Sequence, residues 1–205
     1  MKLHTSIGAP NPRRVNMFLL EKGITHIERQ NYDLNAGEHR SAAFTAMNPI
    51  ARVPVLELDD GRFLAESRAI CSYLESLYPE PNLMGVDAEE CAFIEMADRQ
   101  VEMTLLAAVA NHVRHTHPGL LPLENPQFKD YAAEQGKRMV AAAALFDAVL
   151  ARQPWMAGDR FTVADITAFC GLEFARLVKF KPAEAGFTHL AAWRERMAER
   201  PSAKP

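Results

Sequence analysis

The feature that most limits the possible folds of this chain is a change of pattern near residue 80. Before that point the sequence has short apolar runs separated by turn residues, whereas after residue 87 almost no strand pattern is present. The turn-forming run Pro79-Glu80-Pro81-Asn82 lies between the two halves. The pattern predicts a mixed α/β domain over residues 1–80, a linker over 81–87 and an all-helical domain over 88–205.

The first half predicts strands and helices in the order β-α-β-(α)-β-β-α, which is a thioredoxin-like arrangement. Strands are expected over residues 2–6, 26–33, 53–58 and 62–65, the last two joined as a hairpin by Asp60-Gly61. Helices are expected from an N-cap at Asn11 to Gly23, within 37–47, and from Ser67 to the residues before Pro79.

The second half predicts helices alone. They are expected over residues 88–115, from Asn125-Pro126 through 151, from 162 to 179 and over 187–199. Thr162 is followed three positions later by Asp165, which is a capping-box variant at the start of a helix. Asp165 is therefore expected to be structural, and its loss to cost about 0.5 to 2 kcal/mol of stability.

Charge and cysteine content exclude several classes of partner. Lys and Arg total 23 against 26 Asp and Glu, so nothing favours nucleic acid or an anionic membrane surface. No apolar run is long enough to span a bilayer, and the first residues lack the apolar core of a signal peptide. Cys71, Cys91 and Cys170 are odd in number and contain no C-x-x-C, which favours reduced thiols in a cytoplasmic protein. A small-molecule site or a protein partner is expected.

A proline lies inside the strand-like run "RVPVLELDDGRFLAES". Pro54 cannot donate to a sheet ladder, so it belongs at an edge, at a bulge or in a cis bond. Glu66 and Ser67 follow the hairpin where a helix begins, and a helix N-terminus holds a carboxylate well. The alternatives are an edge proline without a ligand, and a capping serine beside an acid that the helix dipole favours.

The stretches "NPIARVPVLELDDGRFLAESRAICSYLE" and "FTVADI" resemble the two signatures of the cytosolic glutathione S-transferases, and the resemblance covers essentially the whole chain. It implies an α/β + all-α protein, with an N-terminal thioredoxin-like domain and a C-terminal all-helical domain. It also implies that glutathione is the co-substrate, that its thiol is activated to attack an electrophilic apolar acceptor, and that the chain forms a homodimer. From the residues themselves, no metal is expected.

The resemblance assigns glutathione-binding roles to named residues. The backbone of Val53 is expected to pair with the cysteinyl segment of glutathione, with the bond to Pro54 cis. Glu66 is expected to take the γ-glutamyl ammonium and Ser67 the adjacent carboxylate. The glycine carboxylate is expected to meet basic side chains: His39, Arg40 and Arg52. Asp98 is expected to reach the γ-glutamyl group bound by a neighbouring subunit.

The residue that activates the sulfur departs from the family's usual patterns. Where family members carry tyrosine, serine or cysteine, this chain has Thr5 or Ser6, Ala9 and Pro10. Ser6 can donate a hydroxyl, and Asn11 an amide N–H together with the free amides of its helix. The run "NHVRHTHPGL" resembles a segment that holds a water in some family members, which favours His115.

Several alternatives stay open. The histidines of that run could have no role, or could bind a metal, although no cysteine or close acid completes a shell. A glutathione-dependent peroxidase or disulfide reductase, or a non-catalytic binding module with this fold, would also fit the signatures. Disulfide exchange through a protein dithiol is excluded for want of C-x-x-C.

Overall fold

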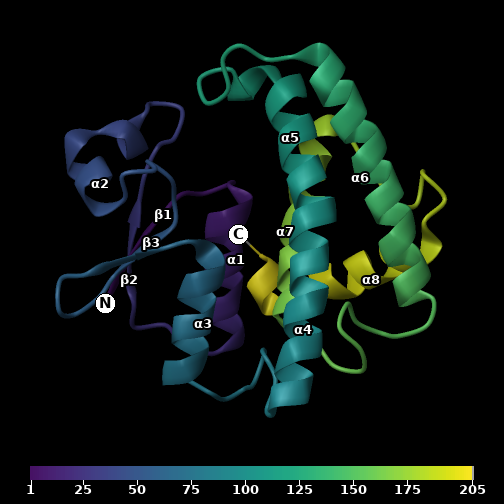
Figure 1. Cartoon of the computed structure of the whole chain (residues 1–205), viewed down its shortest axis with the longest axis horizontal. Coiled ribbons are helices and arrows are strands. Elements are labelled where there is room, and N and C mark those ends of the chain that lie inside the picture. The colour runs from purple at the N-terminus through teal and green to yellow at the C-terminus, as the bar shows by residue number, and fades with distance from the viewer. Residues whose placement is uncertain (205) are drawn as a thin grey trace. The chain divides into compact units, whose positions relative to one another are not determined.

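The computed structural model describes residues 1–204, and Pro205, the last residue of the predicted helical domain, lies outside them (Figure 1). The described chain divides into two compact units, Met1–Pro81 and Asn82–Lys204. Arg160 donates to the carbonyl of Asn82 at 2.6 Å and to its side chain at 2.7 Å. The predicted linker, residues 81–87, is thus bound to the helical unit from Asn82 onwards. Over residues 1–204, no helix is both long and apolar enough to cross a membrane.

The first unit contains a mixed four-stranded sheet in the order β2-β1-β3-β4. The strands are β1 (Lys2–Thr5), β2 (Glu28–Asn31), β3 (Val55–Glu57) and β4 (Phe63–Ala65). β1 runs parallel to β2 and antiparallel to β3, and β3 pairs antiparallel with β4. This is the predicted thioredoxin-like sheet.

The helices of the first unit are α1 (Pro10–Glu21), the 3-10 helix η1 (Glu38–Arg40), α2 (Ala42–Met47) and α3 (Ser67–Leu77). α1 and α3 lie on one side of the sheet, and α2 lies on the other (Figure 1). Fully buried side chains fill the layer between the sheet and the two longer helices: Leu3, Val15, Phe18, Ile70 and Leu74. Burial of these apolar side chains supplies most of the free energy that holds the unit together.

The predicted N-cap at Asn11 is wrong, because α1 already begins at Pro10 and its N-cap is Ala9. Proline suits the first helical turn, where its missing N–H is not needed. Both Pro10 and Pro12 fit this turn, so the sequence allows the helix to begin at either one. Pro10 and Pro12 have no backbone N–H, and the N–H of Arg13 donates to the Ala9 carbonyl at 3.1 Å. The start of α1 therefore offers one unbonded amide, that of Asn11, where several were expected.

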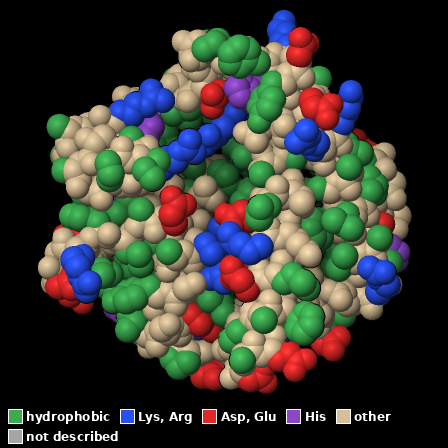
Figure 2. All heavy atoms as spheres, viewed as in Figure 1, with side chains coloured by type: hydrophobic (Ala, Val, Ile, Leu, Met, Phe, Trp, Pro, Cys, Tyr) green, Lys and Arg blue, Asp and Glu red, His purple; other side chains and the backbone are tan. Residues whose placement is uncertain are grey.

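The second unit is helical, as predicted. Its elements are α4 (Ala88–Gln100), the π-helix η2 (Val101–Leu106), α5 (Ala107–Thr116), the 3-10 helix η3 (Pro118–Leu120), α6 (Lys129–Leu150), α7 (Val163–Ala175), the 3-10 helix η4 (Arg176–Val178), α8 (Thr188–Glu199) and the 3-10 helix η5 (Pro201–Ala203). The predicted helix over 88–115 is thus continuous, but its middle segment, residues 101–106, is π-helical. On the face drawn in Figure 2, acidic and basic side chains are interspersed.

The predicted helix start at Asn125-Pro126 is also wrong, because α6 begins at Lys129. The preceding residues are bound to the end of α5 instead. Gln127 donates its side-chain amide to the carbonyls of Arg114 and His117, and the N–H of Phe128 donates to His115 at 3.2 Å. These tertiary hydrogen bonds keep the backbone of Phe128 extended and delay the helix by about one turn.

α7 is the central helix of this unit, and all its residues except Glu173 and Phe174 are buried. The carboxylate of Asp165 near its start accepts the backbone N–H of Thr162 at 3.0 Å and that of Met156 at 2.9 Å. It also accepts the indole N–H of Trp193 on α8. Burial raises the pKa of Asp165 to about 6, although these hydrogen bonds act in the opposite direction.

Candidate functional site

Two pairs of predicted residues lie at the same end of the β3–β4 hairpin. Val55 pairs with Ala65 across the hairpin. The residues directly before Val55 are Val53-Pro54, and those directly after Ala65 are Glu66-Ser67. Both pairs therefore lie at the same end of the two strands. Pro54 is buried, and the Val53–Pro54 peptide bond is cis.

β1, an inner strand, ends at the same end of the sheet. His4 is opposite Val55, so Ser6, two residues further on, emerges beside Val53-Pro54. Ser6 is buried, and within residues 1–204 the structure gives its hydroxyl no hydrogen-bond partner. The Thr5 hydroxyl, in contrast, accepts from the Asn16 amide at 3.2 Å. Of the two hydroxyls considered from the sequence, that of Ser6 has no partner within residues 1–204, whereas the Thr5 oxygen is bound to Asn16 on α1 and keeps only its hydrogen to donate.

The loop before Pro54 is held by a side chain that sequence reasoning missed. Asn48 is buried and donates to the carbonyl of Arg52 at 2.8 Å, while its side-chain oxygen accepts the N–H of Ile50 at 3.2 Å. Ala51 within this loop has a φ of 54°. The Asn48-Pro49 dipeptide, a common turn signal, could have pointed to this clamp. The side chain of Arg52 itself is exposed.

The start of α3 combines an exposed acid with a buried hydroxyl. Glu66 is the N-cap and has φ 67° and ψ 116°, a conformation that costs a non-glycine residue free energy. Its carbonyl accepts the N–H of Ile70 at 2.9 Å, the first bond of the helix. Ser67 is the first helical residue, in the turn whose amides have no partner within the helix. The geometry suits a ligand that carries both an ammonium and a carboxylate.

Arg14 is a second residue that sequence reasoning missed. Its Nη1 donates to the Ser67 hydroxyl oxygen at 3.0 Å, and its side chain is fully buried. A signal for it was present, because residues 14 and 18 share one face of a helix and Phe18 belongs to the core. A charged residue at a core position of an amphipathic helix calls for an explanation.

His39 lies in η1 and is buried. Within residues 1–204 its Nδ1 is buried and has no hydrogen-bond partner. Burial lowers the pKa of His39, and the neighbouring charge of Arg40 lowers it further, so the site disfavours the charged form of the ring. Neither His39 nor Arg52 forms a hydrogen bond to Ser67 in the described chain.

His115 lies in the helical unit near the end of α5. Its Nδ1 accepts the Phe128 N–H, so the proton of the neutral ring is on Nε2, which lies 3.9 Å from a carboxylate oxygen of Glu124. The ring packs edge-on against Tyr131 with centroids 5.1 Å apart. This tautomer makes Nε2 a donor rather than a base.

The neighbouring histidines each serve a separate contact. His112 Nδ1 lies 2.8 Å from the carbonyl of Ala132, and His117 Nδ1 accepts the N–H of Gly119. Within residues 1–204, no group of three or more His, Cys, Asp or Glu side chains is placed to hold a metal ion.

The expectation for Asp98 is wrong. Its side chain is fully buried in the helical unit, where it accepts the hydroxyl of Thr167 on α7 and pairs with Arg99 at 2.9 Å. A carboxylate that has no exposed surface and is already bonded to Thr167 and Arg99 is not placed to meet a ligand bound by another subunit. The contact between Asp98 on α4 and Thr167 on α7 is a tertiary contact, which the local sequence does not reveal.

Comparison with known proteins decides the family. The model of the glutathione S-transferase N-terminal domain matches residues 9–77, and that of the C-terminal domain matches residues 107–201. Glutathione S-transferase 2 of Saccharomyces cerevisiae is 38% identical over 206 residues, which span 100% of this chain and 88% of that protein. The chain belongs to the glutathione S-transferase family. The predicted family and its transferase activity are thereby confirmed.

Solved glutathione S-transferase structures agree with this assignment. A glutathione S-transferase domain-containing protein of Marinobacter aquaeolei has 42% identity and a TM-score of 0.93, with 100% of both chains covered. Gtt2 of Saccharomyces cerevisiae has 38% identity and a TM-score of 0.92, with 98% of both chains covered. The predicted fold, a thioredoxin-like domain followed by a helical domain, is confirmed.

Proposed function

We propose that this glutathione S-transferase binds glutathione at the end of the sheet where Ser6, Val53-Pro54 and Glu66-Ser67 emerge, and transfers it to an electrophilic apolar acceptor. The observation that carries the proposal is the strand register, which brings three separate stretches of sequence to that end of the strands. The cysteinyl segment of glutathione would pair in extended form with the backbone of Val53, as an added strand does.

The two ends of glutathione would be held by different chemistry. The ammonium of the γ-glutamyl group would pair with Glu66, and its carboxylate would accept from Ser67 and the free amides of the first turn of α3. His39 and Arg52 would meet the glycine carboxylate. The buried Nδ1 of His39, which has no partner within residues 1–204, supports this role, because a buried polar atom needs a hydrogen bond.

Activation of the sulfur requires a modest shift of its pKa. A thiol with a pKa of about 8.5 is about 3% ionised at pH 7, and lowering that pKa to about 6.5 takes roughly 2.7 kcal/mol. One hydrogen bond to the thiolate supplies about 1.5 to 3 kcal/mol. The hydroxyl of Ser6 would supply this bond, and the Asn11 amide would add to it. His115 would act through a water held by its Nε2–H.

In the transfer step the thiolate sulfur forms a bond to an electrophilic carbon of the acceptor, and the leaving group departs with the electron pair of the bond that breaks. The thiol proton passes to water. A peroxidase or disulfide reductase would use the same thiolate on oxygen or sulfur. A non-catalytic binding module would keep glutathione affinity without turnover.

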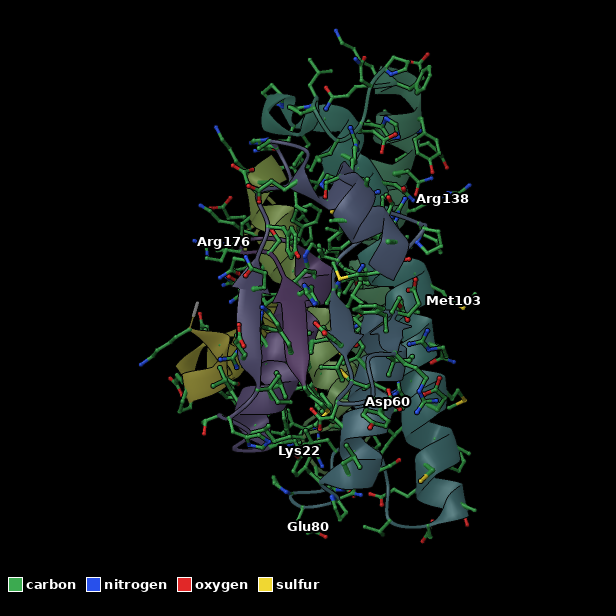
Figure 3. The ribbon with its side chains drawn as sticks, turned by 90° about the vertical axis from the view of Figure 1, so that its left-hand side faces the viewer. Lys22, Asp60, Glu80, Met103, Arg138 and Arg176 are labelled. Carbon is green, nitrogen blue, oxygen red and sulfur yellow. The ribbon has the colours of Figure 1, made fainter. Side chains whose placement is uncertain are left out.

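The partner of the protein is proposed to be a second copy of this chain. A groove of about 510 Å³ lies between the η2–α5 run and α6, lined by Met103, Ala107, Tyr131, Arg138, Ala142 and Leu145. Met103 is 73% exposed and Leu145 52%. Met103 and Arg138 project from the same side of these helices (Figure 3). Exposed apolar side chains flanking a groove are typical of a self-association surface.

The proposed location is the cytoplasm. Its support is that Cys71, Cys91 and Cys170 are thiols and form no disulfide in residues 1–204.

Calorimetric titration with glutathione tests the proposed function, followed by conjugation, peroxide and disulfide assays with the same protein. We expect binding, and conjugation faster than either reduction. Ser67→Ala should weaken glutathione binding about tenfold or more, since a hydrogen bond to a charged group is lost. Ser76→Ala, on the same helix but exposed and bonded to the Ser72 carbonyl, is the matched control. Absence of glutathione binding by the wild type would exclude the proposed function.

A further inference from the structure

Arg14 is a cation enclosed in the core of the first unit. Its side chain is 0% exposed, and its helix neighbours Val15, Met17 and Phe18 are buried with it. An arginine keeps its proton at any physiological pH, so the charge cannot be removed by titration. Placing a charge in a core costs free energy, which favours a role that an apolar side chain could not fill.

The contact between Arg14 and Ser67 has a fixed direction. The guanidinium has N–H donors and no acceptor, so at 3.0 Å the Ser67 oxygen must accept from Nη1. The hydroxyl hydrogen of Ser67 therefore points away from Arg14. Ser67 is 4% exposed and is the first residue of α3, so its hydroxyl lies in the turn whose amides have no partner within the helix, and its hydrogen is left to be donated elsewhere.

We propose that Arg14 is a positioning residue for glutathione binding, which orients the Ser67 hydroxyl as a donor to the γ-glutamyl carboxylate and adds positive charge behind it. This inference rests on the proposed function. Arg14 acts through Ser67 and does not itself touch the ligand. A hydroxyl that accepts from a cation becomes a stronger donor, because hydrogen bonds in a chain polarise one another.

The merely structural alternative is that Arg14 joins α1 to α3. The two roles differ in ligand selectivity. An arginine that only holds the fold affects every ligand of the site alike, whereas one that orients Ser67 affects only ligands with the γ-glutamyl carboxylate. γ-Aminobutyryl-cysteinyl-glycine is the matched probe, because it keeps the ammonium, the thiol and the glycine end and lacks that carboxylate.

The test compares dissociation constants of glutathione and of this analogue for four proteins: wild type, Arg14→Met, Arg14→Lys and Arg13→Met. Wild type should prefer glutathione by about tenfold or more. Arg14→Met should lose most of this preference, and Arg14→Lys, which keeps one charged donor, should retain part of it. Arg13→Met makes the same chemical change at the neighbouring position of α1, where the side chain is partly exposed, and should keep the full preference.

A double-mutant cycle supplies the second readout. In a Ser67→Ala background, Arg14→Lys and Arg14→Met should change glutathione affinity by less than about twofold, because the group through which Arg14 acts is gone. Equal losses of affinity for both ligands, or the same effect with and without Ser67, would overturn the inference. If Arg14→Met does not fold, Arg14→Lys gives the answer by both readouts. Failure of the wild type to bind glutathione would instead remove the proposed function itself.

Discussion

The indole N–H of Trp193 donates to the carboxylate of Asp165 at 3.0 Å, inside the helical unit. The same carboxylate accepts from Met156 and Thr162, so it joins α7, α8 and the loop that precedes α7. Asp165→Ala would leave these buried donors without an acceptor. We expect the free energy of unfolding to fall by roughly 3 kcal/mol or more, beyond the cost of a simple helix cap. Denaturant unfolding measures it, with the exposed Asp159→Ala as control.

The stability contributed by Asp165 should depend on pH. Its pKa is about 6 in the folded protein against an ordinary 3.8. Between these values the folded state holds a proton that the unfolded state lacks, so the contribution is fully present below about 3.8 and is lost as pH rises through 6. From pH 8 to pH 5 it should add about 1 to 2 kcal/mol. The measurement is the difference in unfolding free energy between wild type and Asp165→Asn at both pH values. An identical difference would contradict it.

Ser6→Ala should raise the pKa of the glutathione thiol in the binary complex. Loss of a hydrogen bond worth about 1.5 to 3 kcal/mol corresponds to a rise of about 1 to 2 pKa units. Ultraviolet absorbance of the thiolate, followed against pH, reports the value. Thr5→Val removes the other hydroxyl, whose oxygen accepts from Asn16 on α1, and should leave the thiol pKa unchanged; a rise there as large as in Ser6→Ala would assign the bond to Thr5. A thiol pKa that does not change in Ser6→Ala would assign the activation to another group.

His115→Ala should destabilise the helical unit and slow conjugation. The Phe128 N–H loses its acceptor and the packing against Tyr131 is lost, for a cost of about 1 to 3 kcal/mol. A role in holding a water predicts, in addition, a lower kcat for the protein that remains folded, with glutathione affinity unchanged. Assays well below the unfolding temperature separate the two effects. Wild-type kcat under those conditions would leave His115 with a structural role alone.

Met103→Glu should convert the proposed homodimer into a monomer. The side chain is exposed beside the groove between η2 and α6, and a charge there would be desolvated on association. Sedimentation equilibrium gives the molar mass. Phe128→Glu also introduces an acid at an exposed apolar position of the helical unit but is not among the groove residues, so it should leave the mass unchanged. A monomeric wild type would exclude the dimer.

The features predicted well from sequence were those set by local chemistry. The hairpin at Asp60-Gly61 forms with Gly61 at a φ of 82°, and α3 begins at Ser67 as expected. Local sequence signals gave wrong predictions where contacts between residues distant in sequence determine the structure. The start of α6 depends on His115 accepting from Phe128 across 13 residues, and the burial of Asp98 depends on Thr167.

The arrangement of the candidate site could be anticipated in part for the same reason. Strand pairing follows from the hairpin, so the neighbourhood of Val53-Pro54 and Glu66-Ser67 could be anticipated. The role of Arg14 could not, because it requires knowing that α1 packs beside α3. The contact of the Thr5 hydroxyl with Asn16 on α1 is likewise a tertiary contact that local sequence does not reveal.

The positive φ of Glu66 lowers the stability of the folded chain at a residue that is proposed to bind the ligand. Glycine adopts this backbone conformation without strain, whereas glutamate does so at a cost of about 1 to 3 kcal/mol. Selection of variants for heat resistance alone would therefore favour Glu66→Gly, and would remove the one acid at the start of α3. A library of this protein should be screened for turnover at every round, because this stabilising change would also remove the proposed ligand contact of Glu66.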